Sequence, residues 1–237
     1  MRRLVFSFVA LALLAAPAGA GDLRTLGQSG ALLRAAADGA LVLTPTQGCR
    51  AALSAGEGDC GVLHTAAGPL LFTIEPGPRI DDVLVSRPWT VRVYRPSPSV
   101  PDGWDLALST QPVGSDPGPL FATVTATIRD VTGDGGEELV VGYRSEGTGH
   151  FLDVDIVGTA PDGAARVLAH DRLDHGVVVV RPGRMVTHTP VYRARDGNCC
   201  PTWIVRSTVR FVDGEFQVDP GRRVRTEDAR IPAGDVG

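Results

Sequence analysis

The sequence predicts a mainly β fold of antiparallel, hairpin-built sheets, either propeller-blade-like or sandwich-like, with one short N-terminal helix. Two observations lead to this prediction. Apolar and polar residues alternate with a period of two over residues 122–129 and 203–211, as is typical of strands with one buried face. Turn signals separate such runs, the clearest being Asp213-Gly214, a pair that favours a two-residue hairpin.

The N-terminal 20 residues have the pattern of a signal peptide. Arg2 and Arg3 precede an apolar run over residues 4–16, and small residues at Ala18 and Ala20 provide a cleavage site. The first cysteine is Cys49, so no lipid-attachment cysteine lies near that site. We therefore expect a secreted or cell-envelope-associated protein, with no transmembrane segment after cleavage.

Four segments are expected in this chain of 237 residues. Residues 1–20 are the signal peptide, and 21–112 form an N-terminal β-rich module that opens with a short helix over about 22–37. A Pro- and Gly-rich connector at 111–119 precedes a C-terminal β module at 118–219. Residues 220–237 lack an apolar period and are expected to be a flexible tail.

The strands expected in the two modules share either strict alternation or a continuous apolar run. In the first module they are residues 61–64, 69–74, 89–94 and 104–109; in the second they are 122–129, 139–143, 152–156, 177–180, 203–211 and 215–218.

Residues 130–139, DVTGDGGEEL, form an acidic, glycine-rich loop between two of these strands. Ca²⁺ takes about six to eight oxygen ligands. We expect them from five loop residues: Asp130, Thr132, Asp134, Gly136 through its carbonyl, and Glu138. Two carboxylates about 5 Å apart repel by about 3 kcal/mol at an effective dielectric near 20, and a cation would remove that cost. The alternative is a metal-free turn, held by Asp and Thr side chains bonded to the loop's own backbone.

This loop resembles the calcium loop of FG-GAP and VCBS repeats, D-x-[DN]-G-D-G-x-x-[DE]-L. Thr132 replaces the usual Asp or Asn, so one charge is missing and weaker affinity is expected. Together with the later Asn198-Cys199-Cys200-Pro201 turn, the loop also resembles the exported actinobacterial LppP/LprE lipoprotein-like family. That resemblance implies an envelope or secreted location and no particular activity.

Four cysteines in an exported chain are expected to form disulfides. Cys49 and Cys60 flank a glycine-containing loop, and Cys199 and Cys200 are adjacent. We favour the pairs Cys49–Cys60 and Cys199–Cys200, although adjacent cysteines form a strained bond. The other two connectivities, which join the two halves of the chain, stay open.

Composition and motifs limit the function. The net charge is −4, every basic side chain is Arg, and no basic stripe is present, which argues against nucleic-acid binding. Residues 170–175, HDRLDH, suggest zinc, but His170 and His175 would lie on opposite faces of a strand. We favour a solvated turn there.

Two hypotheses remain. The first is a non-catalytic exported module whose Ca²⁺ rigidifies a hairpin for stability or for binding a protein or cell-wall partner. The second is a secreted hydrolase whose acidic active site assembles only in the fold.

Overall fold

The computed structural model describes residues 58–78, 86–99, 103–110, 121–145, 151–197, 200–229 and 231. The expected signal peptide, the N-terminal helix and the 111–119 connector lie outside these residues. The described chain forms three antiparallel sheets, so the prediction of a mainly β, antiparallel fold is confirmed.

The sheets follow one another along the chain. The N-terminal sheet contains β1 (Asp59–Thr65), β2 (Gly68–Pro76), β3 (Trp89–Pro96) and β4 (Trp104–Thr110). The middle sheet contains β5 (Thr123–Arg129), β6 (Glu138–Arg144), β7 (Leu152–Thr159) and β8 (Ala165–Leu173). The C-terminal sheet contains β9 (Val177–Arg181), β10 (Arg184–Val191), β11 (Trp203–Val212), β12 (Glu215–Val218) and β13 (Arg222–Arg225). A 3₁₀ turn, η2 (Thr226–Asp228), follows β13.

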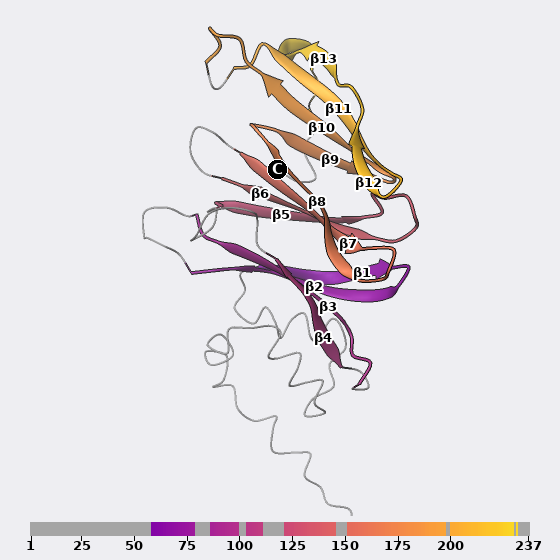
Figure 1. Ribbon diagram of the computed structural model, residues 1–237. Helices are drawn as coiled ribbons and strands as arrows, with labels where there is room; N and C mark the ends of the chain where they lie inside the picture. The colour runs from indigo at the N-terminus through magenta and orange to yellow at the C-terminus, as the bar shows by residue number, and fades with distance from the viewer. Residues whose placement is uncertain are drawn as a thin grey trace, which may run out of the picture.

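Figure 1 shows the three sheets stacked as layers in chain order, with the middle sheet between the other two. In the N-terminal and middle sheets, each strand pairs with its neighbour in sequence. This meander is the arrangement of a propeller blade, and it forms because each short turn returns the chain beside the strand it has just left. Stacking covers both faces of the middle sheet, so its central strands β6 and β7 are almost entirely buried.

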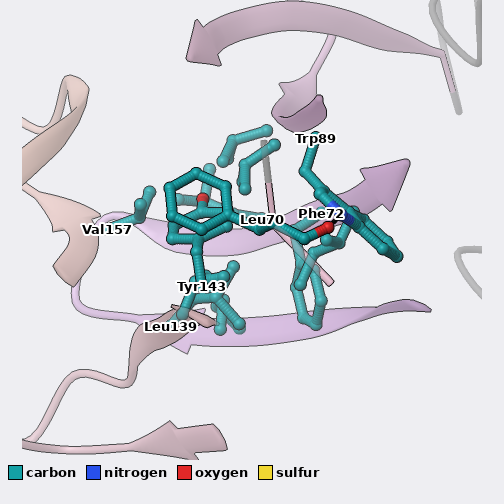
Figure 2. Packing of buried hydrophobic residues seen from close by; sticks show 12 residues of the cluster. Leu70, Phe72, Trp89, Leu139, Tyr143 and Val157 are labelled. Carbon is teal, nitrogen blue, oxygen red and sulfur yellow. Dashed lines mark hydrogen bonds between the residues drawn. The ribbon is translucent and has the colours of Figure 1, made fainter. Parts of the chain in front are cut away.

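Two hydrophobic layers hold the stack together. The first lies between the N-terminal and middle sheets. Figure 2 shows Leu70, Phe72 and Trp89 meeting Leu139, Tyr143 and Val157 across this layer. The second layer lies between the middle and C-terminal sheets and includes Val140, Leu152, Val154, Val178 and Val180. Burying each large aliphatic side chain stabilises the fold by about 1.5–3 kcal/mol, so these layers account for the face-to-face packing.

Strands β5 to β12 divide between two sheets, and strand alternation does not report which strands share a sheet. The structure differs from the sequence expectations in two places. Residues 222–225, expected within a flexible tail, form β13 and pair with β11. The solvated turn expected over residues 170–175 begins later, because β8 continues to Leu173.

Candidate functional site

The acidic loop over residues 130–137 connects β5 to β6, and its carboxylates bind its own backbone. Asp130 accepts hydrogen bonds from the Gly133 nitrogen at 2.6 Å and the Gly135 nitrogen at 3.1 Å. Asp134 accepts one from the Gly136 nitrogen at 2.7 Å. Gly133 and Gly135 have φ angles of 80° and 88°, a region that favours glycine. The glycines therefore let the loop turn its N–H groups toward these carboxylates.

Glu138 points into the stack and is only 3% exposed. Its Oε2 accepts hydrogen bonds from the Val131 nitrogen at 2.8 Å and the Thr132 nitrogen at 3.1 Å, and its Oε1 accepts one from Thr132 Oγ1 at 3.3 Å. Burial raises the pKa of Glu138 above its usual value of 4.5; the backbone hydrogen bonds oppose this shift, and the charges of Asp134 and Asp130 add to it. The buried Glu138 carboxylate thus joins the start of β6 to the first residues of the loop.

The loop also contacts both neighbouring sheets. The Glu137 nitrogen donates to the His64 carbonyl at 2.9 Å, and Glu137 Oε2 lies 2.8 Å from the His64 nitrogen and 3.0 Å from His64 Nδ1. On the other side, the Gly183 nitrogen, in the β9–β10 turn, donates to the Asp130 carbonyl at 2.9 Å. One loop of the middle sheet is therefore bonded to β1 and to the C-terminal sheet.

The fit of a cation to this loop is limited by the same hydrogen bonds. In the part of the chain that the structure describes, no group of three or more His, Cys, Asp or Glu side chains is arranged to hold a metal ion. Asp130 and Asp134 lie in the loop and Glu138 follows it as the first residue of β6, but each accepts hydrogen bonds from N–H groups of the loop. The described geometry matches the metal-free alternative, because backbone donors compete for the oxygens that a cation would need. Calcium binding stays a prediction.

Two further carboxylates are buried on β7, where they alternate with apolar residues. Asp153 is fully buried and binds Arg172 through two hydrogen bonds of 2.5 and 2.8 Å. Asp155, 2% exposed, lies 2.7 Å from His170 Nδ1. Burial raises the pKa of Asp155, although the interaction with His170 opposes that shift. Sequence reasoning missed both pairs because the middle sheet is covered on both faces.

The possible zinc residues do not converge. His170 faces Asp155 from β8, whereas His175 Nδ1 lies 2.5 Å from Asp174 in the following turn. His175 is also one of two non-glycine residues, within the described segments, that have a positive φ angle. Each histidine thus has its own carboxylate partner.

The cysteines are only partly described. Cys60 and Cys200 each take part in a disulfide bond, and no free cysteine is found among the residues described. Because Cys49 and Cys199 lie outside those residues, the pairing stays a prediction.

Comparisons with known proteins assign this chain to no family. No family model matches the chain, and no curated protein matches it. One solved structure is similar, described as the crystal structure of PliI-Ah, the periplasmic lysozyme inhibitor of I-type lysozyme from Aeromonas hydrophyla. It is 20% identical with a TM-score of 0.34, and the match covers 49% of this chain and 89% of that one. A TM-score this low supports no inference about function. Within the described ranges, no helix has the length and apolar character needed to cross a membrane.

Proposed function

We propose that this protein is an exported, non-catalytic β protein of the cell envelope or extracellular space that binds a protein or cell-wall partner. One observation supports this most directly. Among the residues that the structure describes, the three most buried carboxylates are those of Glu138, Asp153 and Asp155. They are at most 3% exposed, and each is bonded to donors of the same chain. A glycosidase-type site needs two carboxylates about 5–9.5 Å apart that reach the substrate. Carboxylates bonded within the stack do not reach a substrate.

The expected hydrolase alternative would need an acid that is both exposed to substrate and shifted in pKa. Glu138 and Asp155 have raised pKa values because they are buried. Burial also keeps a substrate from them. A rigid stack of three sheets with internally paired charges is better suited to presenting a surface than to performing chemistry.

Calcium enters this proposal as a stabilising ligand of the acidic loop. Each carboxylate oxygen has about two lone pairs, so Asp130 and Asp134 keep acceptor capacity beyond their bonds to backbone nitrogens. A cation held there would act on the loop that joins all three sheets. The expected affinity is weak, about 10⁻⁴–10⁻³ M, as in other extracellular calcium modules.

Binding of the fluorescently labelled protein to isolated envelopes of the producing organism tests the main proposal. We expect saturable cosedimentation that unlabelled folded protein displaces and heat-unfolded protein does not. Protease treatment of the envelopes would abolish binding to a protein partner, whereas muralytic digestion would abolish binding to the wall. Non-saturable sedimentation would contradict the proposal. Release of soluble wall fragments that is lost in Asp155→Asn would favour the hydrolase.

A further inference from the structure

A pocket of about 720 Å³ lies at the end of the stack where turns of all three sheets meet. Its lining comes from the β1–β2 turn, the acidic loop between β5 and β6, the β7–β8 turn with the start of β8, and the end of β11 with the turn after it. We name it the turn pocket; its lining includes Ala67, Asp134, Asp162, Arg166 and Phe211. Its volume is within the range of about 300–1,000 Å³ that is typical of ligand sites.

Contacts between the turns hold the turn pocket in place. The Glu137 nitrogen of the acidic loop donates to the His64 carbonyl of β1 at 2.9 Å. In the β7–β8 turn, the Gly163 nitrogen donates to the Ala160 carbonyl at 2.8 Å. A Cβ at Gly163 would lie 3.5 Å from the Cβ of Ala67, so the β1–β2 and β7–β8 turns are in contact. Because the turns brace one another, a ligand meets a preformed pocket and does not have to order it.

The polar groups of the turn pocket are open to solvent. Asp134 is exposed, and the side chains of Asp162 and Arg166 are 56% and 58% exposed. Arg166 Nη2 donates to Asp162 Oδ2 at 2.5 Å, and Asp134 Oδ1 accepts from the Gly136 nitrogen at 2.7 Å. A guanidinium has five N–H donors, and each carboxylate oxygen has about two lone pairs. The three charged groups can therefore bond a ligand without losing these hydrogen bonds.

The charges of the lining favour a neutral ligand. The charged side chains are two carboxylates, Asp134 and Asp162, and one guanidinium, Arg166, so their charges of −1, −1 and +1 sum to −1. This balance disfavours an anionic ligand. A cationic ligand would gain one new ion pair, with Asp134, because Asp162 already has Arg166 as its partner. Solvent-exposed ion pairs contribute little to binding.

Apolar surface is present in the turn pocket in small pieces. Ala67 and Pro161 are exposed on the two turns that touch, and Phe211 of β11 is partly buried. Interface hot spots between proteins are large anchors in fully desolvated pockets, whereas the turn pocket is open. Small apolar areas between hydrogen-bond donors and acceptors instead match a ligand whose own surface alternates between hydroxyl and C–H groups. A sugar ring has this surface.

We propose that the turn pocket binds a neutral saccharide segment of a cell-wall polysaccharide. A hydroxyl group both donates and accepts hydrogen bonds, so sugar hydroxyls donate to Asp134 and accept from Arg166. The C–H groups of the ring cover Ala67 and Phe211. Such a ligand uses the acceptors, the donors and the apolar areas of the lining together and needs no charge of its own. This inference rests on the proposed function and narrows its partner to a wall glycan.

Isothermal titration with trisaccharides tests the ligand class. The neutral probes are chitotriose, cellotriose, maltotriose and mannotriose, in a buffer with chelator so that no calcium occupies Asp134. Trigalacturonate is the anionic control and spermidine the cationic one. We expect at least one neutral probe to bind at least about tenfold more tightly than either control. Saturable binding of no neutral probe, or tighter binding of trigalacturonate or spermidine, would overturn the proposal.

Two protein variants locate the site. Arg166→Ala removes a donor, and Ala67→Trp fills the pocket with a larger side chain. Each should weaken binding of the tightest neutral probe about fivefold or more. Thermal melting checks that each variant folds, and Arg166→Ala alone decides the matter if Ala67→Trp does not melt cooperatively.

Each variant has a matched control. Arg210 forms the same kind of exposed pair, with Asp219, outside the lining of the pocket, so Arg210→Ala is the control for Arg166→Ala. Ala194 is exposed and also lies outside the lining, so Ala194→Trp is the control for Ala67→Trp. Both controls should change affinity less than about twofold. Equal losses in a pocket variant and its control would overturn the proposal.

The same variants separate this inference from the proposed function. If Arg166→Ala and Ala67→Trp bind envelopes as the wild type does, the pocket proposal fails and the proposed function stands. If the wild type binds a neutral trisaccharide but not envelopes, the pocket proposal stands and the proposed function fails.

Discussion

Glu137 and His64, which are 73 residues apart in sequence, are joined by three hydrogen bonds. Two of them involve the backbone, and the third joins the two side chains. The Glu137 nitrogen donates to the His64 carbonyl, and Glu137 Oε2 accepts from the His64 nitrogen while lying 3.0 Å from the ring. Because His64 belongs to β1 and Glu137 leads into β6, this contact fixes the position of the N-terminal sheet against the middle sheet at their loop end.

Glu137→Gln should lower the free energy of unfolding at pH 7 by about 0.5–1 kcal/mol. The value is small because the His64 and Glu137 side chains are 78% and 36% exposed. The hydrogen bond from the His64 backbone lowers the pKa of Glu137 below 4.5. Its stabilisation is therefore present above pH 4.5 and lost as the pH falls through the lower, folded-state pKa. Urea unfolding between pH 3 and pH 7 measures this difference.

Glu215→Gln is the matched control, because Glu215 is exposed on β12 and should have little effect. A wild-type-minus-variant difference that stays constant down to pH 3 would contradict the role assigned to Glu137.

Glu138 should show the opposite dependence on pH. Burial raises its pKa above 4.5, so between pH 4.5 and the raised value the folded state binds more protons than the unfolded state. The contribution of Glu138 to stability therefore falls as the pH rises through this window. Glu138→Gln keeps an acceptor oxygen for the Val131 and Thr132 nitrogens and removes the charge. Without calcium, we expect the variant to be at least as stable as the wild type at pH 7 and less dependent on pH. Marked destabilisation at pH 7 would show that the loop needs the charge.

Calcium should raise the melting temperature if the loop takes it up. At about 10 mM calcium and a dissociation constant of about 1 mM, the stabilisation is about 1.4 kcal/mol. Asp134→Asn keeps an acceptor for the Gly136 nitrogen and removes one charge, so it should lose most of this shift. Scanning calorimetry with calcium, magnesium or chelator measures it. Equal melting temperatures in all three buffers would leave the loop as a metal-free turn.

The sequence was sufficient for most of the strands and for the turn chemistry of this molecule, but it missed β8, β10 and β13. Alternation placed Trp203 and its neighbours on a strand, and the glycines of residues 133–136 indicated the tight loop that the structure contains. Both are local properties, set by side-chain period and by φ angles.

The sequence was insufficient wherever one residue's environment depends on a distant sheet. Asp153 and Asp155 alternate with apolar residues, as solvated positions do, but the N-terminal sheet covers that face and they are buried. The groove beside Arg184 and Val186 depends on the register of β9, β10 and β11, which no short motif encodes. The carboxylate oxygens that we expected to face a cation instead accept hydrogen bonds from backbone N–H groups. A pattern of acidic residues predicts that carboxylate oxygens are present, but it does not predict the direction in which they point.

The Asp153–Arg172 pair gives the sharpest test of the buried charges. Arg172 is half exposed at 52%, whereas Asp153 is fully buried. Arg172→Ala would leave a buried carboxylate without its cation, so we expect a loss of about 2 kcal/mol or more in the free energy of unfolding. The exposed pair Arg166–Asp162 is the control, and Arg166→Ala should cost less than about 1 kcal/mol. Asp153→Asn combined with Arg172→Ala should recover part of the loss, because no unpaired charge then remains in the stack. Urea unfolding of the three variants at pH 7 measures these differences. Equal losses for Arg172→Ala and Arg166→Ala would mean that water reaches Asp153 and that the two facing sheets do not exclude solvent from it.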